Sequence, residues 1–167
     1  MKITKIMKFG GSSVGTPKMI RQAGNIIRTA AKKDKIAVVV SAFQGVTDEL
    51  LNLVNLFSNS YELENRLKML HGRHLKTIQQ LVKTQQGKRQ GAEYIENLFK
   101  ELELVLEKIK KEKSASPKNL DWVASFGERL SAYIIAASIK NGYFVDAREL
   151  VKTDNNFVNA AVDFNKT

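Results

Sequence analysis

The feature that most constrains this chain is a glycine-rich turn, KFGGSSVG at residues 8–15, which lies between an apolar segment and a helical pattern. Residues 3–9 are typical of a first strand, and Thr16 followed by Pro17 is typical of the start of a helix. Glycines at a strand-to-helix turn let backbone N–H groups approach an anion, and the helix N-terminus adds a favourable field. Because Lys8 adds a positive charge at the strand end, the turn predicts a phosphate-binding loop.

Two better-known phosphate motifs do not fit this turn. Gly10 and Gly15 match the glycines of G-x-x-x-x-G-K-[ST], but Thr16 and Pro17 stand where that motif requires lysine and serine or threonine. The sequence contains no G-x-G-x-x-G, which argues against a dinucleotide site. A glycine turn is also an ordinary connection between a strand and a helix, and Lys8 alone is compatible with a solvated strand end. The turn therefore needs support from other segments.

The next segments predict a β-α-β unit. Apolar residues recur at helical spacing after Pro17, and IAVVV at residues 36–40 is typical of a parallel strand buried on both faces. A loop follows at residues 41–46, and we expect Thr47 to cap the next helix. Both loops then leave the same edge of the sheet, which is where open α/β folds bind ligands.

The middle of the chain predicts a helical hairpin, inserted between sheet elements at about residues 60–112. Two amphipathic stripes flank a polar break at residues 85–91, and the second stripe runs from Ile95 to Ile109. That stripe lasts under three heptads, so packing onto the sheet is favoured over a coiled coil. After a further helix that we expect to end at Asn141 and Gly142, residues 143–145 predict a third strand. Three strands are few for such a sheet. We therefore expect residues 1–167 to be the amino-terminal part of a domain whose remainder is absent.

Composition and charge narrow the class of protein. No run of 18 apolar residues and no signal-peptide pattern occurs, so we expect a cytoplasmic protein without a membrane partner. The absence of cysteine excludes disulfides and thiolate metal sites, and His71 and His74 lack a third ligand, so no metal site is predicted. The net charge of +10 is compatible with nucleic acid. Much of the basic charge falls beside glutamates on helix faces, however, and no recognition motif is present, so we expect no nucleic-acid partner.

Four segments together resemble the amino-terminal half of aspartate kinases, in the amino-acid kinase superfamily. They are KFGGSS at residues 8–13, VSAFQGVTD at 40–48, GERLS at 127–131 and VDAR at 145–148. Their order and spacing match, and the similarity covers essentially the whole chain. The resemblance implies an α/β fold, a partial three-layer αβα sandwich of the amino-acid kinase type with the helical hairpin inserted. It also implies phosphorylation of the aspartate β-carboxylate by ATP and Mg²⁺, on the route to lysine, threonine and methionine.

The resemblance also implies a role for each matching residue. Lys8 would be catalytic and stabilise the transferring phosphoryl group, and Ser41 and Thr47 would contact aspartate. Glu128 would hold the ammonium group of the substrate, and Arg129 beside it is a further candidate for substrate binding. The ATP phosphates would lie against Lys8, Phe9, Gly10, Gly11 and Ser12. An aspartate carboxylate has a pKa of about 3.9 and is ionised at neutral pH, so the reaction needs positioning and charge neutralisation rather than a general base.

Simpler roles remain open for several of these residues. Thr47 is also suited to capping a helix, Glu128 to complementing a helix dipole, and Ser41 to satisfying a loop amide. In the family most of the nucleotide pocket lies later in the catalytic domain, so we expect this chain to be an inactive fragment of the parent enzyme. Two alternatives are a non-catalytic assembly module that dimerises through the Ile95–Ile109 stripe, and an amino-acid kinase acting on glutamate, carbamate or a uridylate. A homo-oligomer is compatible with the sequence.

Overall fold

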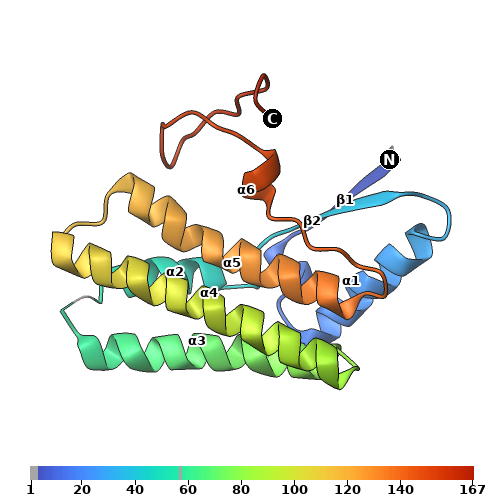
Figure 1. The fold of residues 1–167 in the computed structure, drawn as a ribbon, viewed down its shortest axis with the longest axis horizontal. Coiled ribbons are helices and arrows are strands. Elements are labelled where there is room, and N and C mark those ends of the chain that lie inside the picture. The colour runs from blue at the N-terminus through green and yellow to red at the C-terminus, as the bar shows by residue number, and fades with distance from the viewer. Residues whose placement is uncertain (1–3, 57) are drawn as a thin grey trace.

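The computed structural model describes residues 4–56 and 58–167, and its sheet is built on a β-α-β unit. Strand β1 (Lys5–Phe9) lies parallel to β2 (Ile36–Val40), with Phe9 opposite Val40. The 3₁₀ turn η1 (Gly11–Ser13) and helix α1 (Pro17–Ala30) connect the two strands (Figure 1). The predicted β-α-β unit is confirmed, and both loops that follow the strands leave the same edge of the sheet. Residues 1–3, including the predicted start of the first strand, lie outside the described residues.

The starts of α1 and α2 differ in how they are capped. Thr16 caps α1 as expected, because its hydroxyl accepts a hydrogen bond of 3.3 Å from the Met19 amide. The prediction that Thr47 caps the next helix is wrong. Helix α2 (Val46–Val54) begins two residues earlier than a cap at Thr47 would place it, after Gly45 at a φ of 78°, a left-handed conformation that suits glycine. Burial of the Val46 side chain fixes this start, and Thr47 lies inside the first helical turn.

Three long helices form the rest of the body. They are α3 (Ser60–Leu81), α4 (Gln85–Glu112) and α5 (Pro117–Ser138), and a short α6 (Ala147–Leu150) follows (Figure 1). Helices α3 and α4 form the expected hairpin, but the predicted break at residues 85–91 is helical. The helix starts there because Thr84 accepts a hydrogen bond of 3.1 Å from the Gly87 amide and so caps it. The true break is residues 82–84.

The sheet differs from the sequence-based prediction in two ways. Residues 143–145 do not form a strand, since Phe144 instead packs against Tyr94 and Tyr133, with ring centroids 5.5 and 5.7 Å away. The strand at residues 36–40 is not buried on both faces, because Val39 keeps 52% of its surface exposed. Ile6, on the neighbouring strand, is 72% exposed. Within the described residues, cover by helices is therefore incomplete on this sheet.

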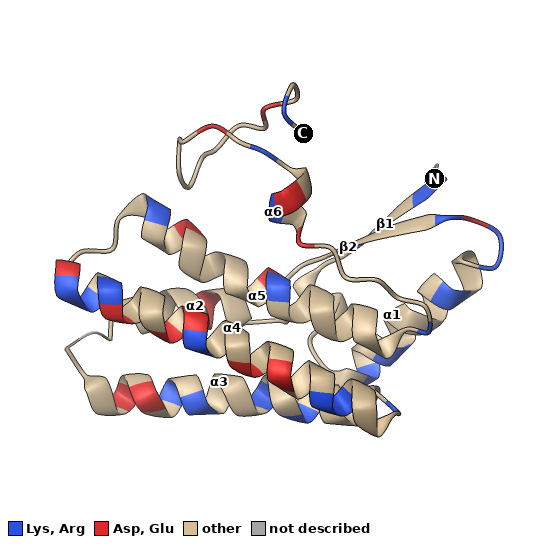
Figure 2. Cartoon of the chain, in the orientation of Figure 1, with Lys and Arg blue, Asp and Glu red and all other residues tan. Residues whose placement is uncertain are grey.

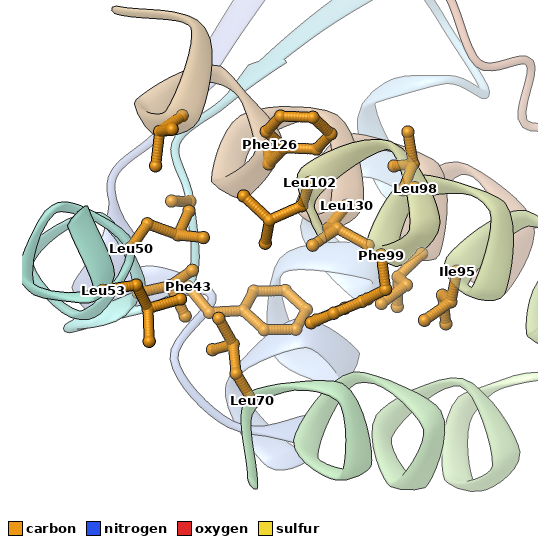
Figure 3. Close-up of a cluster of buried hydrophobic side chains, with 14 of the residues drawn as sticks. Phe43, Leu50, Leu53, Leu70, Ile95, Leu98, Phe99, Leu102, Phe126 and Leu130 are labelled. Atoms are coloured by element: carbon orange, nitrogen blue, oxygen red, sulfur yellow. The ribbon is translucent and has the colours of Figure 1, made fainter. Parts of the chain in front are cut away.

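The hydrophobic core lies between the helices and reaches the loop after β2. Phe43 extends from that loop and lies among side chains from α2, α3, α4 and α5 (Figure 3). The predicted stripe of α4 is buried in this core, with Ile95 and Ile109 each at most 1% exposed. The stripe therefore packs within the chain, as the sequence favoured over a coiled coil. Among the described helices, none combines the length and apolar character that crossing a membrane would require.

Charged side chains of both signs occur along α3 and α4 (Figure 2). Several form ion pairs one helical turn apart, such as Lys68 with Glu64 at 2.7 Å and Lys100 with Glu96 at 3.7 Å. Pairs of this kind stabilise an exposed helix by only about 0.3–0.5 kcal/mol each. On the helix faces they pair Arg66, Lys68, Lys100 and Lys108 with glutamates one turn away.

Candidate active site

The first loop places the charge of Lys8 directly over a glycine. A Cβ atom built on Gly10 would lie 3.5 Å from the Lys8 Nζ, so the ammonium folds back over the turn. Gly11 opens η1, where a Cβ would lie 3.0 Å from the Ala42 carbonyl oxygen. Glycine is therefore required for the close approach of the first loop to the second. Ser12, the next residue in η1, is exposed.

The second loop is fixed by β1 on one side and by α5 on the other. The Ser41 amide donates a hydrogen bond of 3.1 Å to the Phe9 carbonyl and so continues the pairing of the strands. The Ala42 amide donates to Glu128 Oε1 at 3.2 Å, and Glu128 is partly buried on α5. Helix α5 comes this close because Gly127 has no side chain. A Cβ there would lie 2.8 Å from that of Ala42.

The structure therefore brings most of the predicted site residues to one place. Lys8 lies over Gly10, Gly11 lies against Ala42, and Ala42 bonds to Glu128. Phe9 belongs to the same cluster through its carbonyl, since its side chain packs against the core. Ser41 precedes Ala42, and Thr47 lies in the first turn of α2 at the end of the same loop. A cation, the backbone of two loops and a carboxylate therefore belong to one chain of contacts.

The structure does not bring Arg129 to this mouth. Its guanidinium forms a bidentate pair with Glu101 on α4, at 3.1 and 2.8 Å, and lies 3.5 Å from Asp146. The ring of Trp122 also donates to Glu101, at 3.3 Å. The hydrogen bonds from Arg129 lower the pKa of Glu101, and those from Arg148 lower the pKa of Asp146. Arg129 therefore ties α5 to α4 and to the segment before α6.

A buried histidine supports the second loop from α3. The His74 ring stacks on Phe43, with centroids 5.2 Å apart and planes within 8°. Its Nδ1 donates to the Leu70 carbonyl at 2.7 Å, so Nε2 carries no proton and has no hydrogen-bond partner in the part of the chain that is described. Burial, assisted by the nearby charge of Arg73, lowers the pKa of His74 to about 4.

The protein is expected to lose stability between pH 6.5 and pH 4 because of His74. The unfolded chain binds a proton at a histidine pKa of about 6.5, whereas the folded state resists it until about 4. The unfolded state therefore binds more protons in this window, and stability falls as the pH falls. From about pH 7.5 to about pH 5 the loss should be about 2 kcal/mol. Urea unfolding at both values, in the native protein and in His74→Phe, measures it. An equal loss in both proteins would contradict this role for His74.

Two residues at the site, Gln44 and Arg73, were not predicted from the sequence. Gln44 packs against Gly15, where a Cβ would lie 3.0 Å from that of Gln44. Arg73 lies on α3, 29 residues after Gln44, and its Nη2 donates to the carbonyls of Gly15 and Gln44, at 3.1 Å each. Gln44 lies inside the matched segment at residues 40–48, so the resemblance offered a pointer to it. For Arg73, a single arginine on a helix face, the sequence offered none.

The described side chains include no group of three or more histidine, cysteine, aspartate or glutamate residues that could hold a metal ion. His71 lies 3.2 Å from Glu96, and its ring contacts Phe99 at a centroid distance of 4.7 Å. His74 lies in the core. Both histidines are thus accounted for by packing and pairing.

Known proteins resemble this chain in sequence. The sequence model of the amino acid kinase family matches residues 4–165. Aspartokinase 1, chloroplastic, of Arabidopsis thaliana is 32% identical over 152 residues, which cover 88% of this chain and 25% of that protein. The aspartokinase of Candida albicans is 26% identical over 170 residues, 91% of this chain and 29% of its own. The chain thus spans about a quarter of the length of these relatives.

The fold also has close counterparts among solved structures. Aspartokinase III of E. coli in complex with aspartate and ADP superimposes with a TM-score of 0.81 at 23% identity, over 95% of this chain and 34% of that one. The same enzyme in complex with lysine and aspartate gives a TM-score of 0.80. The α/β class expected from the sequence is confirmed by these likenesses and by the parallel sheet of β1 and β2.

Proposed function

This chain belongs to the amino acid kinase family, and we propose that it forms the phosphate-binding and aspartate-binding part of an aspartate kinase. The observation that carries the proposal is the contact chain from Lys8 through Gly11 and Ala42 to Glu128. It joins a cation that suits a terminal phosphate to a carboxylate that suits an ammonium group. The aspartokinase names of its relatives support the choice of aspartate as the acceptor.

The chemistry requires little beyond this arrangement. The attacking β-carboxylate is already ionised, so the protein must hold it in line with the γ-phosphate and neutralise the charge on the phosphoryl oxygens. Lys8 supplies that neutralisation, and the amides of Gly10 and Gly11 supply hydrogen bonds. Glu128 pairs with the substrate ammonium, which selects an amino acid over a simple diacid. Ser41 and Thr47 lie in the loop and helix turn that would contact the rest of aspartate.

The first loop suits the phosphates of ATP, because the Lys8 ammonium lies over the turn, with Nζ 3.5 Å from a Cβ built on Gly10. Mg²⁺ belongs to the proposal as the ion bound to the phosphates of ATP, where it neutralises their charge. In this proposal Ser12 and Phe9 contribute through the backbone of the turn. Arg129 acts differently from the sequence-based hypothesis: it holds α5, and hence Glu128, in place through Glu101.

Replacing Glu128 with glutamine in the complete protein tests the acceptor site. The amide oxygen of glutamine can still accept from the Ala42 amide, while the charge opposite the substrate ammonium is lost. A hydrogen bond between charged groups is worth about 1.5–3 kcal/mol, so the KM for aspartate should rise by about 10–100-fold. Aspartate-dependent release of ADP measures it. The control is Glu107→Gln, at an exposed position of α4, which should leave the KM for aspartate unchanged. An unchanged KM in Glu128→Gln would contradict the role of Glu128.

Two other functions were compatible with the sequence. An assembly module that dimerises through the α4 stripe is disfavoured, because Ile95 and Ile109 are buried inside the chain. A kinase acting on glutamate, carbamate or a uridylate would be identified by a substrate panel on the complete protein. The division of the domain, with residues 1–167 as its amino-terminal part, a hairpin inserted at about 60–112, and a fragment inactive by itself, remains part of the proposal. So do a cytoplasmic location and a homo-oligomer.

A further inference from the structure

The two loops of the proposed site approach each other closely without backbone hydrogen bonds between them. Residues 10–15 and 42–45 are all described, and no backbone N–H of either segment donates to the other. Their contact is steric, through the missing side chains of Gly11 and Gly15. Packing of this kind resists closer approach but does not prevent the loops from separating.

Arg73 supplies the missing connection. One guanidinium nitrogen, Nη2, donates to the Gly15 carbonyl and to the Gln44 carbonyl, at 3.1 Å in both cases. Gly15 ends the first loop and Gln44 belongs to the second, so one group bridges both. The guanidinium carbon also lies 5.9 Å from the centre of the Phe43 ring.

Arg73 is exposed on α3, its backbone is part of a regular helix, and no acid among the described residues engages its side chain. Its own carbonyl accepts a hydrogen bond of 2.8 Å from Thr77, one turn further along α3. The next residue, His74, stacks on Phe43 of the second loop. Within residues 4–56 and 58–167, no carboxylate forms an ion pair with Arg73. Burial lowers the pKa of the Arg73 guanidinium, although arginine stays charged at any ordinary pH.

We infer that Arg73 is a positioning residue for phosphoryl transfer, which fixes the separation of the loop that binds phosphate and the loop that binds the acceptor. The inference rests on the proposed function, because the distance between donor and acceptor matters only if a group passes between them. In-line transfer depends on this separation, and a displacement of about 1 Å in a reacting group costs about a hundredfold in rate. The α3–α4 hairpin thereby becomes part of the catalytic framework.

The test compares Arg73→Met and Arg73→Lys in the complete protein with the matched control Lys68→Met, an exposed position on the same helix. Arg73→Met should lower kcat by about 10–100-fold, with each KM within about threefold and an unchanged melting temperature. Arg73→Lys, which restores a charged donor, should recover part of the lost kcat. An unchanged kcat in Arg73→Met, or a loss of kcat that merely follows a loss of melting temperature, would overturn the inference.

Hydrogen exchange separates this inference from the proposed function. Amides of residues 10–15 and 41–46 should exchange faster in Arg73→Met than in the native protein or in Lys68→Met, whether or not the protein phosphorylates aspartate. A native protein without aspartate-dependent ADP release would refute the proposed function and with it the catalytic role of Arg73, while faster exchange would still establish the bridge. Unchanged exchange in both segments would refute the bridge itself.

Discussion

Replacing Lys8 with methionine in the complete protein is expected to lower kcat by about 10²–10³-fold, the effect of removing one preorganised group that stabilises charge in a transition state. The ammonium lies over Gly10 in the first loop, and within the described residues no carboxylate pairs with it. Its charge is therefore available to a phosphoryl group. Methionine keeps most of the length and apolar character of the side chain, so the loss reports the charge.

A control for this variant lies on the same strand. Lys5 pairs with Asp34 at 2.6 Å, at the end of β1 away from the site, so Lys5→Met should leave kcat within about twofold. Rates of ADP release with saturating aspartate and ATP measure both variants. A Lys8→Met protein with kcat within threefold of the native value would remove Lys8 from the mechanism.

Replacing Gly127 with valine is expected to cost about 3 kcal/mol of stability, because overpacking at a closed contact forces the backbone apart. The first atom of the new side chain would meet the Ala42 Cβ at 2.8 Å, and side-chain atoms of Leu50 and Val46 lie 3.3 Å away. Helix α5 would have to move away from the second loop, and the hydrogen bond from Ala42 to Glu128 would be lost with it. The KM for aspartate should therefore rise together with the loss of stability.

The same substitution at Gly72 on α3 is the matched control. A Cβ there meets no atom within 4 Å, so Gly72→Val changes only helix propensity and should alter stability by less than about 0.5 kcal/mol. Urea unfolding of both variants measures the difference. Equal stabilities for the two variants would show that the packing of α5 against Ala42 does not require glycine at residue 127.

Local patterns in the sequence were sufficient to predict the first strand pair, its connecting helix and the hairpin. Strands of branched residues and helices with one apolar stripe follow from the periodicity of side chains along each element. The sequence also indicated that Lys8, Gly11 and the loop after residue 40 share an edge, because parallel strands end together. The placement of Glu128 beside that loop depended on the family resemblance, since 86 residues separate Glu128 from Ala42.

The errors arose where tertiary packing decides between local alternatives. Residues 143–145 have the composition of a strand, but Phe144 packs against Tyr94 and Tyr133 and the segment does not join a sheet. Thr47 is a good cap, yet burial of Val46 set the start of α2 two residues earlier, after Gly45. The contacts of Arg73 could not be predicted, because they depend on where two backbone carbonyl oxygens lie in space, and no sequence pattern indicates such positions.

The bond between the Trp122 ring and Glu101 gives the chain a built-in optical reporter. Trp122 is the single tryptophan of these 167 residues, and it shares its carboxylate partner with Arg129, the neighbour of Glu128. Indole emission depends on the polarity around the ring, so a shift of α5 on substrate binding would change the colour and intensity of that emission. Movement of α5 near Glu128 can thus be followed by the fluorescence of Trp122, without attaching a dye.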